Sequence, residues 1–266
     1  MAARHDDGSA GDADYSSIGT AYSVYRQPDP RIAAAILKAL GSAQRILNVG
    51  AGAGSYEPTD RDVTAVEPSA SMRAQRPDHL ATAIDAVAEN LPFPDKWFGA
   101  AMTTFSIHQW SNLRVSLREV RRVTRGPIVI LTCDPSLLDR CWLAEYAPEV
   151  ISTEARRYPS INSIADVLGE VDVTLVPIPR DCVDGFNEAY YGRPEMLLDP
   201  LARTSCSAWS FVDESTAGSY VEHLASDLAD GTWDRTYGHL RTQPTFDGSL
   251  VLLISAGSSA LVDPEL

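Results

Sequence analysis

The sequence is short of three things: paired cysteines, long apolar runs and basic residues. Its four cysteines, Cys133, Cys141, Cys182 and Cys206, stand far apart and form no Cys-x-x-Cys pair. This spacing favours buried reduced thiols over a disulfide framework or a structural metal site. No run of about 18 apolar residues occurs, and no apolar segment follows the first residues, so we expect neither a membrane span nor a secretory signal. The cytoplasm is then the expected location.

Basic residues are outnumbered by acidic ones. The chain has 22 Lys and Arg against 36 Asp and Glu, which gives a formal net charge of -14 and disfavours binding to nucleic acid or anionic membrane. The densest basic segment, residues 114–125, places its arginines on one face of a predicted helix whose other face carries Leu113, Leu117, Val120 and Val123. We interpret these arginines as a solvated surface, so no nucleic-acid partner is expected.

The N-terminal region divides into a polar tail and a helix. Residues 1–14 are small, polar and acidic without periodicity, which predicts a disordered tail. Asp29 followed by Pro30 is typical of a helix start, with Asp29 as the N-cap. The buried face and the end of this helix are predicted by the residues Ile32, Ile36, Leu40 and Gly41.

Short apolar runs then alternate with amphipathic segments. The runs that predict strands are residues 45–49, 63–67, 81–87, 98–105 and 128–133. Helices lie between most of them, and such alternation indicates parallel strands joined by crossover helices. The sequence therefore predicts an α/β fold, and its 44% apolar content is ample for one continuous core.

The pattern changes after Pro135. We expect helices over about 137–147, 161–169 and 213–229, strands over 171–176 and 249–255, and irregular chain over 177–208. The irregular stretch is too long for a simple connection. We interpret about 136–165 and 177–212 as a cap inserted into a single domain of residues 15–266.

A glycine-rich loop follows the first predicted strand. Gly50, Gly52 and Gly54 let the backbone pass close to a ligand, because glycine has no Cβ and adopts positive φ. Position 55 is Ser, so the dinucleotide pattern Gly-x-Gly-x-x-Gly is not met. Glu67 ends the second strand, where a carboxylate can accept both ribose hydroxyls of an adenosine ligand. The alternative interpretation is that the glycine segment is only a flexible turn and that Glu67 caps the following helix.

Five ordered segments carry a family resemblance. They are ILNVGAGAGSYEP, AVEPSASM, AENLPFPDKWF, SIHQW and LREVRRV. Together they resemble the class I S-adenosylmethionine-dependent methyltransferases, in particular the type 11 bacterial branch that acts on small molecules. The resemblance covers about residues 22–133. It implies a Rossmann-like sheet of seven mostly parallel strands in the order 3-2-1-4-5-7-6, with strand 7 antiparallel and helices on both faces.

The same resemblance implies S-adenosylmethionine as cofactor and S-adenosylhomocysteine as product. Gly50, Ala51 and Gly52 would line the methionine moiety, Glu67 would hold the ribose, Met72 would lie against adenine, and the backbone of Ala88 would meet an adenine nitrogen. The N-terminal segment, residues 15–40, would fold over the site as a lid. The expected cofactor-binding residues are Tyr25, Arg26, Gly50, Ala51, Gly52, Gly54, Glu67, Pro68, Met72, Asp85, Val87, Ala88, Thr104 and Phe105.

Three positions depart from the family pattern. Asn48 stands where an acidic residue often opens the first motif, and Gly99 stands where the fourth motif usually has Asp. Val87 stands where an Asp often meets the adenine amino group. Asp85, two residues earlier, is the expected substitute.

The acceptor side is less defined. His108 follows the fourth predicted strand, where open α/β sheets bind their ligands, and we consider it as a general base or an orienting residue. Core packing at a helix start is the alternative for His108 and for Trp110. Aromatic residues of the cap are expected to shape a mostly apolar acceptor pocket. The expected substrate-binding residues are Tyr22, His108, Trp110, Phe186, Tyr190, Tyr191 and Trp209.

The sequence thus predicts an enzyme that transfers a methyl group to a small, partly apolar metabolite, in secondary or natural-product biosynthesis. No metal is expected, and the oligomeric state is left open. Two alternatives stay open: an NAD-dependent oxidoreductase, and a methyltransferase-like protein that binds the cofactor without catalysis, which the departures at Asn48 and Gly99 would allow.

Overall fold

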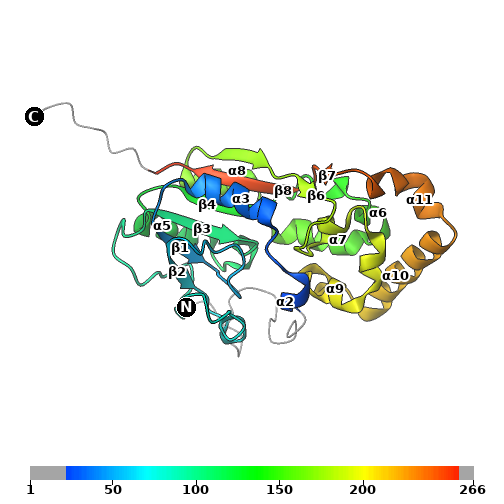
Figure 1. Ribbon diagram of the computed structural model, residues 1–266, viewed down its shortest axis with the longest axis horizontal. Helices are drawn as coiled ribbons and strands as arrows, with labels where there is room; N and C mark the ends of the chain where they lie inside the picture. Colours follow the sequence, from blue (N-terminus) through cyan, green and yellow to red (C-terminus); the bar gives the residue numbers. More distant parts are fainter. Residues whose placement is uncertain (1–21, 258–266) are drawn as a thin grey trace, which may run out of the picture.

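A six-stranded sheet is the centre of the fold in the computed structural model, which describes residues 22–257 (Figure 1). The strands lie in the spatial order β2-β1-β3-β4-β8-β5. Strands β2, β1, β3 and β4 pair in parallel, and β8 runs antiparallel to both of its neighbours. Their bounds are β1 Arg45–Val49, β2 Asp62–Val66, β3 Ala100–Thr104, β4 Ile128–Cys133, β5 Asp172–Leu175 and β8 Leu250–Ser255.

The expected α/β fold and its reversed last strand are confirmed, but the seventh strand is not. Within the predicted strand 81–87 only Ile84 pairs, through an isolated parallel bridge to Val66. This segment lies beyond β2 and contains three alanines, which have little preference for strands. If Ile84 is counted as an edge position beyond β2, the spatial order of the strands is the expected one. The prediction of a full strand over residues 81–87 was wrong.

Helices cover both faces of the sheet because side chains alternate along its strands. Ile46 of β1 packs with the buried face of α3 (Pro30–Leu40), whereas Leu47 points to the opposite layer with α5 (Leu113–Val123) and α8 (Ile161–Leu168). On α5 the residues Leu117, Val120 and Val123 are buried and Leu113 is half-buried, as predicted.

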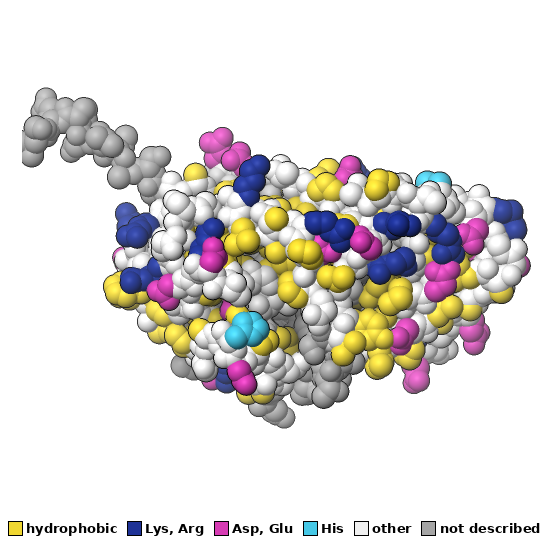
Figure 2. Space-filling view, viewed as in Figure 1, with side chains coloured by type: hydrophobic (Ala, Val, Ile, Leu, Met, Phe, Trp, Pro, Cys, Tyr) yellow, Lys and Arg dark blue, Asp and Glu magenta, His cyan; other side chains and the backbone are white. Residues whose placement is uncertain are grey.

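On the face of the molecule shown in Figure 2, basic side chains lie among acidic ones.

The start of α3 forms as the sequence predicts. The Asp29 carboxylate accepts a hydrogen bond from the backbone N–H of Arg31, and Pro30 occupies the first turn. Gly41 ends the helix with a φ of 61°, a value that glycine adopts without strain. A short helix, α2 (Tyr22–Tyr25), precedes it.

A group of helices and turns lies beside the end of the sheet (Figure 1). It shares one core with α3, since Trp142, Tyr191 and Trp233 belong to the same buried cluster as Ile36. A two-stranded sheet of β6 (Ile178–Pro179) and β7 (Thr245–Phe246) joins this region to the rest. Its helices are α6 Leu143–Tyr146, α7 Pro148–Arg157, α9 Pro200–Thr204, α10 Glu214–Ala229 and α11 Thr232–Tyr237. The remaining short elements are α4 Ala70–Arg73 and the 3-10 helices η1 Ile107–Gln109, η2 Leu138–Arg140, η3 Asn187–Tyr190, η4 Pro194–Leu198, η5 Ser207–Phe211 and η6 Gly238–Arg241.

The helix predicted over 137–147 is broken, which corrects the sequence interpretation. Cys141 adopts an extended conformation between η2 and α6, and Ala147 leaves the helical region before Pro148. A residue before proline is disfavoured in the α region, whereas proline itself fits the first turn, so α7 begins there.

The four cysteines are buried free thiols, as expected. Residues 1–14 and the first part of the predicted lid, residues 15–21, lie outside the described residues.

Candidate active site

A cavity opens at the carboxyl ends of β1, β2 and β3, where parallel α/β sheets bind ligands. It encloses about 870 Å³ of atom-free space, including the part open to solvent. We call it the loop cavity. Its lining residues are Arg26, Gly50, Ala51, Gly52, Ala53, Ser55, Tyr56, Glu67, Pro68, Met72, Ala86, Val87, Ala88, Glu89, Thr104, Phe105, Ser106, Gln109, Trp110 and Asp184.

The glycine loop forms one wall and requires its glycines. Gly50 has a φ of 67°, and a Cβ at this position would lie 2.4 Å from Ser106 Oγ. Both Gly50 and Ala51 donate their backbone N–H to the Val66 carbonyl, at 2.9 and 3.0 Å, which fixes the loop against the end of β2. The backbone therefore lies against β2 and η1, which leaves the space in front of it for a ligand.

Glu67 closes the opposite edge of the loop. Its carboxylate is buried and accepts hydrogen bonds from the backbone N–H groups of Gly52 and Ser69, each at 2.8 Å. Burial raises the pKa of Glu67 above its ordinary value, against the lowering effect of these two hydrogen bonds. The carboxylate keeps further acceptor positions for hydroxyl donors, because each oxygen carries two lone pairs.

A buried acid stands beneath the loop although position 48 is not acidic. Asn48 Nδ2 donates to Glu57 Oε1 at 2.9 Å, and Glu57 Oε2 pairs with Arg76 Nη2 at 2.8 Å. Both side chains of this ion pair are almost fully buried. The acidic group that the first motif leads one to expect at position 48 is thus present nine residues later, where it supports the loop from behind.

The apolar side of the loop cavity comes from Met72, Ala86, Val87 and Ala88. Met72 is buried, and its backbone N–H bonds to the Oγ of Ser69, the N-cap of α4. Asp85, the expected substitute for a missing acid, does not line the cavity.

Asp85 is half exposed instead, and its carboxylate lies 3.5 Å from Arg73. Gly54 lies behind the loop, where a Cβ would meet Leu80 at 2.3 Å, and it also does not line the cavity.

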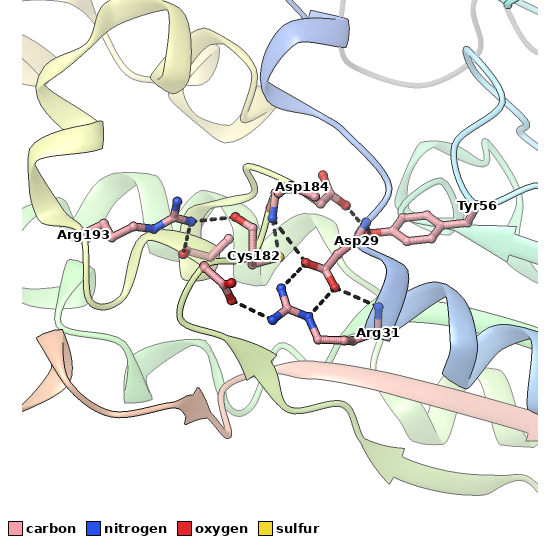
Figure 3. Close-up of polar contacts among 9 residues, drawn as sticks. Asp29, Arg31, Tyr56, Cys182, Asp184 and Arg193 are labelled. Carbon is pink, nitrogen blue, oxygen red and sulfur yellow. Dashed lines mark hydrogen bonds and ion pairs between the residues drawn. The ribbon is translucent and has the colours of Figure 1, made fainter.

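Arg26 and Asp184 lie at the rim of the loop cavity, where Arg26 also donates to the Ser205 carbonyl directly after α9. Arg26 Nε donates to Asp184 Oδ1 at 2.5 Å, and Tyr56 Oη donates to Asp184 Oδ2 at 2.7 Å. Figure 3 shows Tyr56 from the glycine loop meeting Asp184, beside the network of Asp29 and Arg31 at the start of α3. Three segments far apart in sequence are thereby held at one rim.

A second cavity adjoins the first, and we call it the cap cavity. It encloses about 440 Å³ of atom-free space with its open part. Arg26 and Phe105 line both cavities, and Phe105 has the unusual φ of 51° for a residue with a side chain. The complete lining is Arg26, Phe105, His108, Glu154, Tyr158, Phe186, Asn187, Ser205, Cys206 and Ser207.

His108 and Phe186 are the predicted acceptor residues that line the cap cavity. The ring of His108 lies 4.5 Å from that of Tyr158, and the ring of Phe186 lies 5.3 Å from that of Phe105. Trp110 lines the loop cavity instead. The side chain of Tyr22 is outside the described part of the molecule.

The other predicted aromatic residues line neither cavity. Tyr191 is fully buried, stacks on Phe246 at 5.1 Å and donates its hydroxyl to the Gln243 carbonyl. Tyr190 is buried in the core, and Trp209 Nε1 donates to Asn187 Oδ1 at 3.0 Å.

Tyr25 donates its hydroxyl to the carboxylate of Asp199 at the start of α9 and lines neither cavity. The expected mostly apolar acceptor pocket is therefore replaced by a cavity with ionic and amide groups in its wall.

Several lining residues were not among the predicted site residues. Tyr56, Ser106 and Gln109 lie within or next to the motifs, so a search for polar residues beside the glycine loop would have found them. Asp184 and Glu154 come from distant segments, and only the fold brings them to the two cavities.

Comparisons with known proteins agree with this geometry. A family model described as a methyltransferase domain matches residues 47–127. A solved protein from Anabaena variabilis, described as a methyltransferase from an antibiotic biosynthesis pathway, is 30% identical with a TM-score of 0.81, and the alignment covers 88% of this chain and 100% of that one. No curated protein sequence matches the chain.

Two further structures share the fold alone. Phosphoethanolamine N-methyltransferase 2 of Haemonchus contortus, solved with S-adenosyl-L-methionine, is 18% identical with a TM-score of 0.51, covering 89% of this chain and 56% of that one. The cyclase SpnF is 16% identical with a TM-score of 0.50, covering 96% and 87%.

Two features are absent from residues 22–257. No helix there combines the length and apolar character that crossing a membrane requires. That part of the chain also has no group of three or more His, Cys, Asp or Glu side chains arranged to hold a metal ion.

Proposed function

The chain belongs to the class I S-adenosylmethionine-dependent methyltransferases, and from this premise we propose that it methylates a small, partly apolar metabolite bound in the cap cavity. The observation that carries the proposal is that the loop cavity and the cap cavity share a wall, formed by Arg26 and Phe105. A cofactor in one cavity and an acceptor in the other would meet at these residues.

The loop cavity has the chemistry that S-adenosylmethionine requires. Glu67 would accept the ribose hydroxyls, since it is a buried carboxylate at the end of β2. Met72 and the backbone near Ala88 would hold the adenine. Gly50 and Gly52 would border the methionine part, because their lack of side chains keeps the loop surface open.

The bound cofactor supplies a methyl group already activated by a positive sulfur, so the task of the chain is to align the acceptor and exclude water. Correct positioning alone can lower a barrier by roughly 7–11 kcal/mol. Phe105 and Arg26 would do this at the shared wall, with the Arg26 guanidinium 5.0 Å above the Phe105 ring and fixed by Asp184. Their rigidity favours one acceptor position.

His108 is proposed to act on the acceptor rather than on the cofactor. It lines the cap cavity and does not line the loop cavity. A histidine there can accept a proton from an acceptor hydroxyl or amine as the methyl group arrives, or orient an acceptor that has no proton to lose. The cap cavity is partly aromatic through Phe105, Tyr158 and Phe186, which suits a metabolite with an apolar portion.

A role in secondary metabolism is proposed on the similarity to the Anabaena variabilis protein, which is described as part of an antibiotic biosynthesis pathway. The net charge of -14 favours a small-molecule acceptor over nucleic acid or an anionic membrane, and the cytoplasm is the proposed location.

Two measurements test the proposal. Titration calorimetry with the full chain is expected to show saturable binding of S-adenosylmethionine, and its absence would refute the cofactor site. Incubation with methyl-labelled cofactor and a small-molecule extract of the source cells is expected to label a metabolite. Label found only in nucleic acid or protein would refute the small-molecule acceptor. Binding without any labelled product would support a cofactor-binding protein without catalysis.

A further inference from the structure

Glu154 of α7 brings a carboxylate into the wall of the cap cavity. Its Oε2 accepts a hydrogen bond of 2.7 Å from Asn187 Nδ2. Asn187 is itself held by Trp209, whose Nε1 donates to the Asn187 side-chain oxygen at 3.0 Å. These two hydrogen bonds therefore fix the position of the Glu154 carboxylate and the orientation of the Asn187 amide.

This carboxylate has no cationic partner among residues 22–257. Arg26 and Arg157 are the nearby cations, but Arg26 is bound to Asp184 and Arg157 donates to Ser207 Oγ at 2.9 Å. Burial raises the pKa of Glu154, against the lowering effects of the Asn187 hydrogen bond and of the charges on Arg157 and Arg26. A cation bound directly beside the carboxylate would favour its charged form.

The cavity around Glu154 also suits a cation by its aromatic walls. Phe105, Tyr158 and Phe186 line it together with His108. Aromatic faces attract cations through the negative charge of the ring face, and this attraction grows where water is excluded. A cation of the acceptor would thus gain from the carboxylate and from the rings at once.

Resting on the proposed function, we propose that Glu154 selects acceptors that carry a protonated amine on a small apolar body. The ammonium would pair with Glu154 on the side away from Asn187, and the apolar body would lie among the rings. Acceptors with a carboxylate in place of the amine would be repelled by Glu154. Glu154 is in this view a specificity residue, independent of which atom receives the methyl group.

The test uses three probes of matched shape with the full chain saturated with S-adenosylhomocysteine, which prevents turnover. Phenethylamine is the cation, phenethyl alcohol its neutral counterpart and phenylacetate its anionic one. Titration calorimetry is expected to rank the amine first by roughly tenfold or more over the alcohol, with phenylacetate weakest. Equal binding of amine and alcohol, or absence of saturable amine binding, would overturn the proposal.

Glu154→Gln removes the charge and keeps the shape. The variant is expected to bind phenethylamine roughly ten- to a hundredfold more weakly and phenethyl alcohol as before. Glu149→Gln is the matched control, because Glu149 is exposed on the same helix and carries the same charge. An unchanged amine affinity in Glu154→Gln would also overturn the proposal.

The dissociation constant for S-adenosylhomocysteine separates the two levels of failure. If the unaltered chain does not bind S-adenosylhomocysteine, the proposed function fails. If it binds and the amine preference is missing, only the role of Glu154 fails. Glu154→Gln is expected to retain S-adenosylhomocysteine affinity, and Glu154→Asp provides a second variant that keeps the charge and should retain the amine preference.

Discussion

Arg26 and Asp184 are 158 residues apart in sequence and form an ion pair of 2.5 Å at the rim of the loop cavity. Both side chains are largely buried, and Tyr56 adds a second hydrogen bond to the same carboxylate. Asp184 therefore connects the segment before α3, the glycine loop and the chain after β6. Asp184 thus joins three separate segments at this rim of the loop cavity.

Asp184→Ala is expected to lower the free energy of unfolding by about 3–5 kcal/mol, because it removes the carboxylate that pairs with the buried Arg26 guanidinium and accepts from Tyr56. Affinity for S-adenosylmethionine should fall with it, since Arg26 and Tyr56 both line the cavity. Urea unfolding and calorimetry measure the two effects. Asp181→Ala is the control: Asp181 pairs with Arg31 but is 77% exposed, so a loss of about 0–1 kcal/mol is expected. Equal losses in both variants would contradict the role of Asp184.

Glu67→Gln should weaken S-adenosylmethionine binding roughly ten- to a hundredfold, because a hydrogen bond to a charged acceptor is replaced by one to a neutral amide. Asp85→Asn is expected to leave the affinity unchanged, since Asp85 lies outside the cavity beside Arg73. Calorimetry on both variants compares the two acids directly. A larger effect at Asp85 than at Glu67 would reverse their assignment.

Gly50→Ala is expected to abolish measurable cofactor binding. The new Cβ would lie 2.4 Å from Ser106 Oγ, so the loop or η1 must move. Gly41→Ala separates this clash from backbone strain, because Gly41 also has positive φ but has open space around it. The control should lose about 1–2 kcal/mol of stability and retain cofactor affinity. Normal binding by Gly50→Ala would show that the loop is not a close-approach site.

His108→Ala should retain S-adenosylmethionine affinity, because His108 does not line the loop cavity. Turnover of a labelled acceptor is expected to fall by roughly a hundredfold or more if the acceptor loses a proton to this residue. His108→Gln, which can still donate and accept hydrogen bonds, separates orientation from proton transfer. Full turnover by His108→Ala at every pH around neutrality would exclude a general-base role.

Glu188 makes stability depend on pH. Burial raises its pKa to about 7, and Ser249 holds its carboxylate through the backbone N–H and the hydroxyl. The folded state then binds the proton more tightly than the unfolded state. The contribution to stability is complete below about pH 4.5 and is lost as pH rises towards about 7.

Glu188→Gln should therefore be more stable than the unaltered chain near neutral pH, by up to about 3 kcal/mol, with the difference vanishing at lower pH. Urea unfolding across this pH range measures it, and the comparison of the two chains cancels the other titrating groups. A constant difference at all pH values would show that Glu188 does not titrate in this range.

The sequence predicted the bounds of the two inner strands Arg45–Val49 and Ile128–Cys133, because both are rich in apolar residues and are followed by turn residues. The sequence overestimated the length of strand structure around Ile84. An edge segment pairs on one side only, and its alanines contribute little to strand stability. The helix α7 was missed because its apolar spacing is irregular and Pro148 looked like a break.

Most of the lining of the loop cavity was predictable because these residues follow one another in ordered motifs. The residues that support the glycine loop from behind were harder to predict. Glu57 takes the place of the acid missing at position 48 only because the folded loop brings it to Asn48. The acceptor side was not predictable, since Glu154, Asn187 and Tyr158 come from separate segments. Aromatic density in the sequence pointed to Tyr190 and Tyr191, which the fold uses to fill its core.

The wall shared by the two cavities has a consequence for redesign. A substitution at Phe105 or Arg26 would change the walls of both cavities. Such a substitution would alter the affinity for the cofactor together with the choice of acceptor. Asn187 and Ser207 line only the cap cavity. Libraries aimed at new acceptors are best confined to that far wall, where selection for activity does not also select against the cofactor.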